Sequence, residues 1–387
     1  MQKQYFYGRQ YLDDEDRDKA LQVLKSDFLS QGPVLEKFEQ SVSQYFGSKY
    51  CIAVSNATAA LHLACRSLGV EDGDIVWTTS LSFVATANAV RYCGAKVEFI
   101  DINSDTFNLS ISQLQIRLDK AKSIGKLPKV LIPVHFAGEP CEMIQIHKLS
   151  KIYGFKILED AAQAMGATYF DSIIGDCRYS DVTVFSLHPV KSITSGEGGL
   201  ILTNSKSIYK QALIERTHGI NRKNVTKNTP PWVAEMESEG FNYKLTEFQC
   251  SLGVSQLKKL DAFMLKRRQL ADIYKQLMKN TSATFQSNSN KSSSAWHLMI
   301  IKFDFNSLGI NKKSFYNHMK DKGINLALHY YPIHLHSFYQ GLGFKKGSLP
   351  NTEEYYEQAF TFPLHYSIER DDVEYICKQI QTFTRER

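Results

Sequence analysis

The most informative segment of the chain is Thr183-Val-Phe-Ser-Leu-His-Pro-Val-Lys-Ser-Ile-Thr-Ser-Gly-Glu-Gly-Gly-Leu-Ile-Leu-Thr203. Two β-type runs, 182–187 and 199–203, flank a glycine-rich turn with Pro189, so the pattern predicts two strands that meet near Lys191. A lysine held between apolar strands can lose part of its charge by desolvation and become a nucleophile toward aldehydes. The other interpretation is a solvated surface lysine beside a turn, which is the usual situation for a single such residue.

The composition is that of an ordinary globular protein. Of 387 residues, 43% are hydrophobic and 22% are charged, so the chain can bury a substantial core. The formal net charge of +6 is spread without a block of like charges, which argues against nucleic-acid binding and suits a small anionic substrate or plain solubility. Seven cysteines without a C-x-x-C pair, no signal-peptide pattern and no membrane-spanning apolar run favour a cytoplasmic enzyme.

From Tyr50 onward, β-like runs alternate with helical segments. The runs are 50–54, 74–78, 96–100, 130–135, 156–159, 182–187 and 200–203. Strands separated by helices of this length form a mainly parallel sheet that is covered on both faces. The sequence therefore predicts an α/β fold, with ligands bound beyond the carboxyl ends of the strands.

Two helices are predicted ahead of the sheet. Residues 1–32 form an N-terminal arm, in which the acidic cluster at 13–16 favours the positive end of a helix that continues to Leu24. A large domain is predicted at 33–255. It begins with an amphipathic helix at 33–46, whose apolar face consists of Leu35, Phe38, Val42, Tyr45 and Phe46.

The second half of the chain predicts a loop, a long helix and a smaller domain. The polar, basic loop at 204–239, which contains Pro230-Pro231-Trp232, is interpreted as mobile or as covering a substrate. A helix of about 246–275 connects to an α+β C-terminal domain at 256–387, with a strand at 297–303 and helices at 312–322 and 371–384. The apolar face of the long helix consists of Phe248, Leu252, Leu257, Leu260 and Met264.

Four further groups fall at the same edge of the predicted sheet as Lys191. Ser55-Asn-Ala-Thr58 begins a helix after a strand, where amide groups can bind a phosphate or simply be capped. Asp160 follows a strand and can keep a ligand's ring nitrogen protonated, or cap the next helix. Ser186 can add a hydroxyl, and Phe83 can stack on a ring or fill the core. Together these groups predict a pocket for pyridoxal phosphate.

Six longer motifs run along the chain. They are SNATAALHLA at 55–64, SFVATANA at 82–89, EDAAQAMGA at 159–167, FSLHPVKSITSGEGG at 185–199, FNYKLTEFQCSLGVSQL at 241–257 and HYYPIH at 329–334. Through these motifs the chain resembles the sugar-nucleotide aminotransferases of the DegT/DnrJ/EryC1/StrS family, almost from end to end. The resemblance implies the PLP-dependent aminotransferase fold type I, with a mainly parallel seven-stranded sheet in a large domain and a smaller α+β C-terminal domain.

The same resemblance implies a role for each matching residue. Lys191 and Asp160 would be catalytic, with pyridoxal 5'-phosphate (PLP) held as a Schiff base on Lys191 and converted to pyridoxamine phosphate (PMP) during turnover. The other cofactor-binding residues would be Asn56, Ala57, Thr58, Phe83, Gln163, Ser186 and, from the neighbouring subunit of a homodimer with a shared active site, Asn242. The sugar nucleotide would contact Tyr7, Asp27, Phe28, Leu29, Ser30, Asn56, His329, Tyr330, Tyr331 and Pro332. No metal, nucleic acid or membrane is implied.

Within the family, the segments YGRQYLDDED, SDFLSQGP, SLSFVATANAVRYCGA, HFAGEP and HPVKSIT most resemble the transaminases of pseudaminic acid synthesis. This implies transfer of an amino group from glutamate to C4 of a UDP-linked 4-keto-6-deoxy-N-acetylhexosamine. The alternatives are a sister aminotransferase for a dTDP-, GDP- or C3-keto sugar, and a non-catalytic sugar-nucleotide-binding module. A dehydratase of the same fold is disfavoured, because that subgroup typically has histidine at the position of Lys191. One departure from the family is Lys244, where arginine is frequent.

Overall fold

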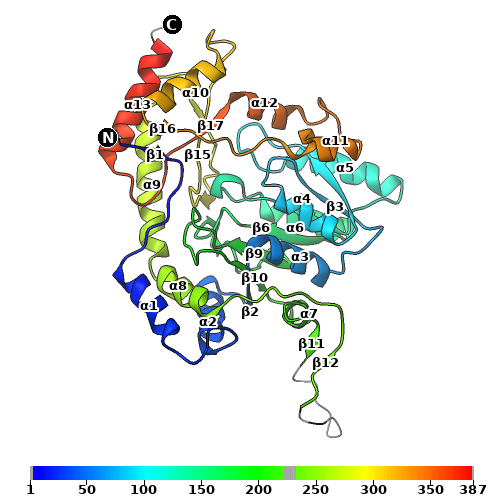
Figure 1. Cartoon of the computed structure of the whole chain (residues 1–387). Helices are drawn as coiled ribbons and strands as arrows, with labels where there is room; N and C mark the ends of the chain where they lie inside the picture. Colours follow the sequence, from blue (N-terminus) through cyan, green and yellow to red (C-terminus); the bar gives the residue numbers. More distant parts are fainter. Residues whose placement is uncertain (1–2, 222–229, 231, 386–387) are drawn as a thin grey trace.

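A seven-stranded sheet lies at the centre of the chain (Figure 1). The computed structural model describes residues 3–221, 230 and 232–385. The strand order is β2-β10-β9-β6-β5-β3-β4, and only β10 runs antiparallel to its neighbours. The strands are β2 (Tyr50–Val54), β3 (Ile75–Thr79), β4 (Lys96–Ile100), β5 (Val130–Ile132), β6 (Lys156–Asp160), β9 (Val182–Ser186) and β10 (Gly199–Thr203). The predicted α/β fold with a mainly parallel sheet is confirmed.

Each face of the sheet belongs to its own hydrophobic core, because side chains alternate along a strand. Along β2, Ile52 and Val54 pack into one core, and Cys51 and Ala53 pack into the other. The first core is covered by α3 (Ala57–Ser67), α4 (Ala85–Tyr92) and α7 (Lys206–Glu215). The second is covered by α2 (Pro33–Phe46), α5 (Ile111–Ser123), α6 (Met143–Tyr153) and α8 (Glu247–Leu257). Strands covered on both faces explain the nearly continuous apolar runs in the sequence.

The helices α1 (Asp14–Leu24) and α2 pack against α8 at one side of the sheet (Figure 1). The bounds predicted for α2 are confirmed. Glu247, at the start of α8, is fully buried and accepts hydrogen bonds from the amides of Val34 (2.7 Å) and Leu35 (3.0 Å). This carboxylate therefore satisfies amide groups that the first turn of α2 leaves free.

The C-terminal part has its own core around α9 (Leu260–Leu277) and α13 (Arg370–Arg385). It contains a three-stranded sheet of β13 (Thr284–Phe285), β15 (Met299–Lys302) and β17 (Ala359–Phe362). The N-terminal strand β1 (Tyr5–Phe6) pairs with β16 (Ile324–Asn325), so the arm reaches this part. The other elements are β7 (Thr168–Tyr169), β8 (Ser172–Ile173), β14 (Ser292–Ser293), α10 (Lys312–Asp321), α11 (Ser337–Gly341), α12 (Pro350–Gln358) and the 3-10 turns η1 (Phe136–Gly138) and η2 (Ile333–Leu335).

Two predicted elements, the loop at 204–239 and the long helix, differ from the structure. Part of the predicted loop at 204–239 is the helix α7, which Ser205 caps and whose residues Ile208 and Ala212 are buried. The rest includes β11 (Ile220–Asn221) and β12 (Glu235–Met236), which project from the body (Figure 1), whereas Pro231 lies outside the described residues. The long helix is divided into α8 and α9, because the Lys259 amide bonds to the Gln256 carbonyl three residues back, in a tightened turn.

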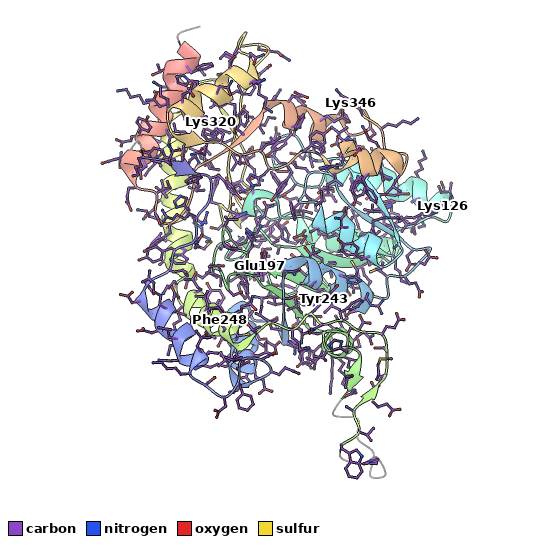
Figure 2. All side chains as sticks on the ribbon, viewed as in Figure 1. Lys126, Glu197, Tyr243, Phe248, Lys320 and Lys346 are labelled. Atoms are coloured by element: carbon purple, nitrogen blue, oxygen red, sulfur yellow. The ribbon has the colours of Figure 1, made fainter. Side chains whose placement is uncertain are left out.

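The apolar face predicted for that long helix is confirmed except at its first position. Leu252, Leu257, Leu260 and Met264 are buried, but Phe248, which is labelled in Figure 2, is 39% exposed. Among the helices that the structure describes, none combines the length and the apolarity needed to cross a membrane.

Candidate active site

A cavity of about 680 Å³ opens where β6 and β9 end and α3 begins. It gathers most of the predicted site residues, which come from segments far apart in the sequence. Those residues are Tyr7, Asn56, Ala57, Thr58, Phe83, Asp160, Gln163, Ser186, Lys191, His329 and Tyr330. Two lining residues that the sequence did not indicate, Glu197 and Tyr243, lie near the middle of the molecule in Figure 2. The cavity lies at the strand ends, where open α/β sheets bind ligands.

The turn that carries Lys191 is closed by hydrogen bonds within itself. Leu187 donates its amide to the Gly198 carbonyl (2.8 Å), and the amide of Lys191 donates to the carbonyl of His188 (2.9 Å). The Thr194 hydroxyl donates to the Leu187 carbonyl (2.9 Å). These bonds fix the backbone on which the lysine stands, so the amine is presented to the cavity from a rigid platform.

Burial changes the protonation of the Lys191 amine. Desolvation lowers the pKa of this amine to about 8, although the negative charge of Asp160 acts in the opposite direction. Within the part of the chain that the structure describes, no carboxylate forms an ion pair with it. Its nearest polar contact is the Nε2 atom of His297, at 3.5 Å. An amine of this kind has a neutral, nucleophilic fraction near neutral pH.

Asp160 is the last residue of β6 and is held on both sides. Its backbone amide donates to the Pro133 carbonyl (3.0 Å). The Oδ2 atom accepts a hydrogen bond from the hydroxyl of Thr86 (2.6 Å), and Oδ1 accepts from the amide of Ala162 (3.1 Å). The carboxylate is only 5% exposed and lines the cavity. These bonds orient it toward a ligand without neutralising its charge.

The first turn of α3 forms a site suited to an anion. Asn56 caps the helix by accepting the Ala59 amide at Oδ1 (2.8 Å). The amides of Ala57 and Thr58 have no acceptor within the helix and lie at its positive end. The start of α3 lies close to β10, and Gly199 allows this because a Cβ atom at that position would lie 2.4 Å from the Asn56 carbonyl oxygen.

Aromatic and amide groups complete the cavity. The Oε1 atom of Gln163 accepts the Ala137 amide (2.7 Å), and its Nε2 donates to the Tyr330 hydroxyl (3.2 Å). Phe83 is 57% exposed at the cavity, with its ring 5.9 Å from that of Tyr330. A large phenylalanine with more than half its surface free is available for stacking, so the alternative of a core phenylalanine is wrong.

Several predicted residues lie outside this cavity in a single chain. Asn242 is exposed and accepts a hydrogen bond from the Lys244 amine (2.6 Å). The segment of Asp27, Phe28, Leu29 and Ser30 runs beside the start of α8, where the amide of Glu247 donates to the Leu29 carbonyl (3.0 Å). Tyr331 donates to the Leu335 carbonyl (3.2 Å), and neither it nor Pro332 lines the cavity. The roles assigned to these residues stay predictions.

Sequence reasoning missed Thr86, His297, Tyr92, His188 and Ser82, which also line the cavity. Thr86 could have been found, because it lies one helical turn after Phe83 in a motif already singled out. His297 carries no local signal, since it is a single histidine beside an apolar strand.

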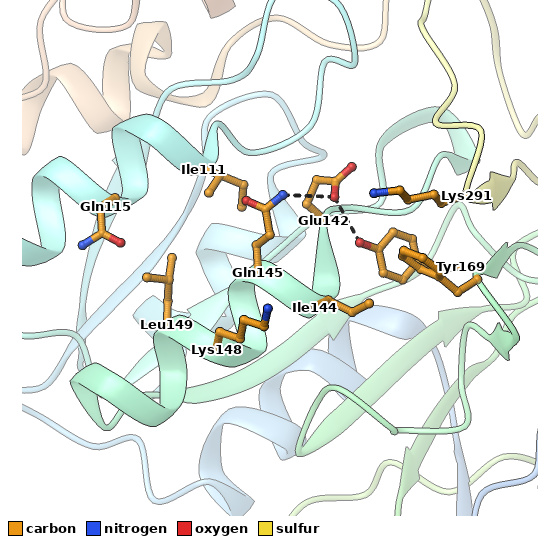
Figure 3. A pocket seen from close by; sticks show the side chains of 10 residues that line it. Ile111, Gln115, Glu142, Ile144, Gln145, Lys148, Leu149, Tyr169 and Lys291 are labelled. Carbon is orange, nitrogen blue, oxygen red and sulfur yellow. Dashed lines mark hydrogen bonds between the residues drawn. The ribbon is translucent and has the colours of Figure 1, made fainter.

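A second cavity, of about 520 Å³, lies between α5, α6 and β7 (Figure 3). The Oε2 atom of Glu142 accepts hydrogen bonds there from Gln145 (3.3 Å) and from the Tyr169 hydroxyl (3.0 Å). Its other polar residues include Lys148 and Lys291. None of the motif residues predicted to bind a cofactor lines it, so the chemistry is assigned to the first cavity.

Comparison with known proteins gives a consistent result. A model described as the DegT/DnrJ/EryC1/StrS aminotransferase family matches residues 10–381. The chain is 35% identical over 372 residues to the UDP-4-amino-4,6-dideoxy-N-acetyl-beta-L-altrosamine transaminase of Campylobacter jejuni, covering 96% of this chain and 95% of that protein.

Solved structures agree with this match. Helicobacter pylori PseC, an aminotransferase involved in the biosynthesis of pseudoaminic acid, superposes with a TM-score of 0.90 at 30% identity over 100% of both chains. The PMP-form of a putative sugar aminotransferase from Streptococcus pneumoniae, Spr1654, gives 0.89 at 25% identity over 98% of both chains.

Proposed function

The chain belongs to the DegT/DnrJ/EryC1/StrS aminotransferase family, and from this we propose that it transfers an amino group from glutamate to C4 of a UDP-linked 4-keto-6-deoxy-N-acetylhexosamine, using PLP. One observation carries the proposal. The partly desolvated amine of Lys191 and the buried carboxylate of Asp160 line the same cavity at the carboxyl edge of the sheet. An aminotransferase needs this combination of a nucleophilic amine and a fixed negative charge.

The residues present fit PLP. The first turn of α3, with Asn56, Ala57, Thr58 and the hydroxyl of Ser186, would hold its phosphate. Phe83 would cover one face of its ring, and Gln163 would lie near the ring hydroxyl. When bound, PLP would supply an aldehyde carbon that carries the amino group and a ring that withdraws electrons.

The chain's own groups would then manage charge and protons. Asp160 would keep the ring nitrogen protonated through its negative charge, while Thr86 and the amide of Ala162 hold the carboxylate in place. Lys191, with a pKa lowered to about 8, can both accept and release a proton at Nζ near neutral pH.

The keto sugar nucleotide would contact the part of the cavity lining formed by Tyr7, His329 and Tyr330. The rings of Tyr7 and His329 lie 4.6 Å apart, in an edge-on contact. Burial, with a smaller contribution from Lys191, lowers the pKa of His329 to about 3, so the imidazole is neutral. Its Nδ1 atom lies 2.8 Å from the Thr361 hydroxyl. A fixed, uncharged lining suits a sugar with hydroxyl and amide groups.

Product analysis tests the proposed substrate. The purified protein would be incubated with PLP, glutamate and a panel of UDP-, dTDP- and GDP-linked keto sugars with the ketone at C3 or C4. We expect the 4-amino product and 2-oxoglutarate from the UDP-linked 4-keto sugar, with a kcat/KM at least about tenfold above the others. A higher kcat/KM for a dTDP- or GDP-linked sugar, or for a C3 ketone, would contradict the substrate assignment.

Removing the hydroxyl that orients Asp160 is expected to slow turnover. In Thr86→Val the carboxylate loses its 2.6 Å hydrogen bond but keeps its charge, so we expect kcat to fall about tenfold, as for the loss of one hydrogen bond to a charged group. Thr86→Ser keeps the hydroxyl and should stay within about threefold of the wild type. Steady-state kinetics measure both. Equal losses in the two variants would show that the bond to Asp160 is not the cause.

We also propose a homodimer with shared active sites, in the cytoplasm, where unpaired cysteines persist. Three observations support it: Asn242 is exposed and outside its own cavity, β11 and β12 project from the body, and all seven cysteines are free thiols. The partners would be glutamate, the UDP-sugar and a second copy of this chain.

Mixed dimers test the sharing of sites. If Asn242 serves the partner's cavity, a heterodimer of Lys191→Ala and Asn242→Ala contains one site with both natural residues and one with neither. We expect each variant alone to be strongly impaired and the heterodimer, isolated with two affinity tags, to recover about half of the wild-type rate. No recovery, or an Asn242→Ala homodimer with full activity, would contradict a shared site.

A further inference from the structure

The imidazole of His297 lies next to the amine of Lys191. The Nε2 atom lies 3.5 Å from the Nζ atom of Lys191, and the residue is only 3% exposed. Its other ring nitrogen, Nδ1, is buried and has no hydrogen-bond partner among the described residues. A buried polar atom without a hydrogen-bond partner lowers the stability of the fold, so this histidine is not explained by packing alone.

The backbone around His297 is hydrogen-bonded to the 3-10 turn η1. The amide of His297 donates to the Ala137 carbonyl (2.9 Å), and the amide of Ala295 donates to the Gly138 carbonyl (3.0 Å). The amide of Ala137 in turn donates to Oε1 of Gln163 (2.7 Å). The imidazole and the Gln163 amide are therefore positioned by one rigid turn.

A buried arginine holds the same segment from the other side. The Nη1 atom of Arg267 donates to the carbonyls of Trp296 (3.3 Å), His297 (3.3 Å) and Leu364 (2.8 Å). Arg267 is 3% exposed and forms no ion pair within the described part of the chain. Trp296 has a left-handed backbone with φ of +47°, which is strained for a bulky residue. Strain of this kind persists only where the surrounding contacts enforce the backbone conformation.

These surroundings keep the imidazole neutral. Desolvation is the main cause, and the positive charges of Lys191 and Arg267, with smaller effects from His329 and His188, also hold the pKa of His297 well below its usual value. Asp160, a carboxylate that lines the same cavity, acts in the opposite direction on the amine and raises the pKa of Lys191. A neutral imidazole beside an ammonium group accepts a hydrogen bond at Nε2 and carries its proton at Nδ1.

We propose that His297 is a positioning residue for the reaction: its Nε2 atom accepts a hydrogen bond from the protonated amine of Lys191 and holds that amine in place while it carries the proton. The inference rests on the proposed function. It matters because the lysine side chain is long and flexible, and no carboxylate is paired with it among the described residues. Without the imidazole, the protonated amine of Lys191 would sample many rotamers and reach the reacting carbon less often.

Two substitutions separate the hydrogen bond from packing. His297→Phe keeps the ring volume and removes the acceptor, whereas His297→Gln keeps a neutral acceptor. His365→Gln is the matched control: His365 is 5% exposed, its Nδ1 atom also lacks a partner among the described residues, and it is absent from the residues lining the cavity. If circular dichroism shows that His297→Phe does not fold, His297→Leu takes its place.

The first readout needs no cofactor and no turnover. Competitive acetylation of the PLP-free protein from pH 6 to 11, quantified on the Lys191 peptide, gives the titration midpoint of the amine. We expect a midpoint near 8 in the wild type and His365→Gln. We expect it about one pH unit lower in His297→Phe, because a hydrogen bond to the charged amine is lost, and within about 0.3 of the wild type in His297→Gln.

The second readout separates kcat from KM. In the PLP-loaded enzyme we expect kcat to fall about 10- to 100-fold in His297→Phe with KM for the sugar within about twofold, and His297→Gln to recover most of kcat. An unchanged midpoint in His297→Phe, or a glutamine variant as impaired as the phenylalanine variant, would overturn the proposal. If no protein in the series transaminates, the proposed function fails, while the midpoints still decide whether His297 holds the amine.

Discussion

Lys191→Ala is expected to lower kcat by more than about 10⁴-fold, because a methyl group can neither form a covalent bond with an aldehyde nor carry a proton. The amine stands on a hydrogen-bonded turn and has a pKa lowered to about 8 by burial, so no other described group of the cavity duplicates it. Both halves of the exchange should be lost. The first is measured as 2-oxoglutarate formed from glutamate, and the second as the 4-amino sugar formed in the presence of added PMP.

A lysine outside the cavity provides the control. Lys148 lines the second cavity (Figure 3), and Lys148→Ala should keep kcat within about twofold of the wild type. Turnover by Lys191→Ala above about one per cent of the wild-type rate would show that another group moves the proton.

Asp160→Asn is expected to have the second largest effect, a fall in kcat of about 10³-fold. Asparagine has the shape of aspartate, and its carbonyl oxygen can still accept the Ala162 amide, so the substitution removes the negative charge with little change in packing. Without that charge the ring nitrogen of the cofactor would lose its proton, and the ring would withdraw electrons poorly. Steady-state kcat and the Kd for PLP are measured together, and we expect kcat to change far more than Kd.

An exposed carboxylate is the comparison for this variant. Asp119 lies on α5, where its Oδ1 accepts the Tyr153 hydroxyl (2.5 Å), and Asp119→Asn should leave kcat unchanged. If Asp160→Asn kept more than about a tenth of the wild-type kcat, a fixed negative charge at the end of β6 would not be required for catalysis.

The large sheet could be predicted because its strands are buried on both faces, which makes them short, apolar and separated by helices. The run at 182–187 and the turn around Lys191 have this pattern, and they correspond to β9 and the loop before β10. The helix α2 was equally plain, since its four buried residues recur at helical spacing. By contrast, α7 lies among polar and basic residues, and its two buried apolar positions, Ile208 and Ala212, are too few to indicate a helix.

The cavity residues that could be predicted are those in motifs next to strand ends. Asp160 and Ser186 end their strands, so the parallel sheet brings them to one edge. Tyr7 and His329 are assigned from the family resemblance, because no local sequence pattern brings residues 7 and 329 to the same cavity. His297 was not predicted at all, because its place behind Lys191 depends on backbone bonds to Ala137 and on Arg267. Contacts of such sequence separation leave no periodicity to detect.

The measurement that tests the central claim most directly is borohydride reduction of the PLP-loaded protein, followed by peptide mapping. The claim is that the amine of Lys191 is the covalent attachment point for the aldehyde of PLP. Reduction should fix one pyridoxyl group per chain, on the peptide that contains Lys191, and should abolish activity. A protein that binds PLP but takes up no label on reduction, or carries the label on a different lysine, would contradict the account.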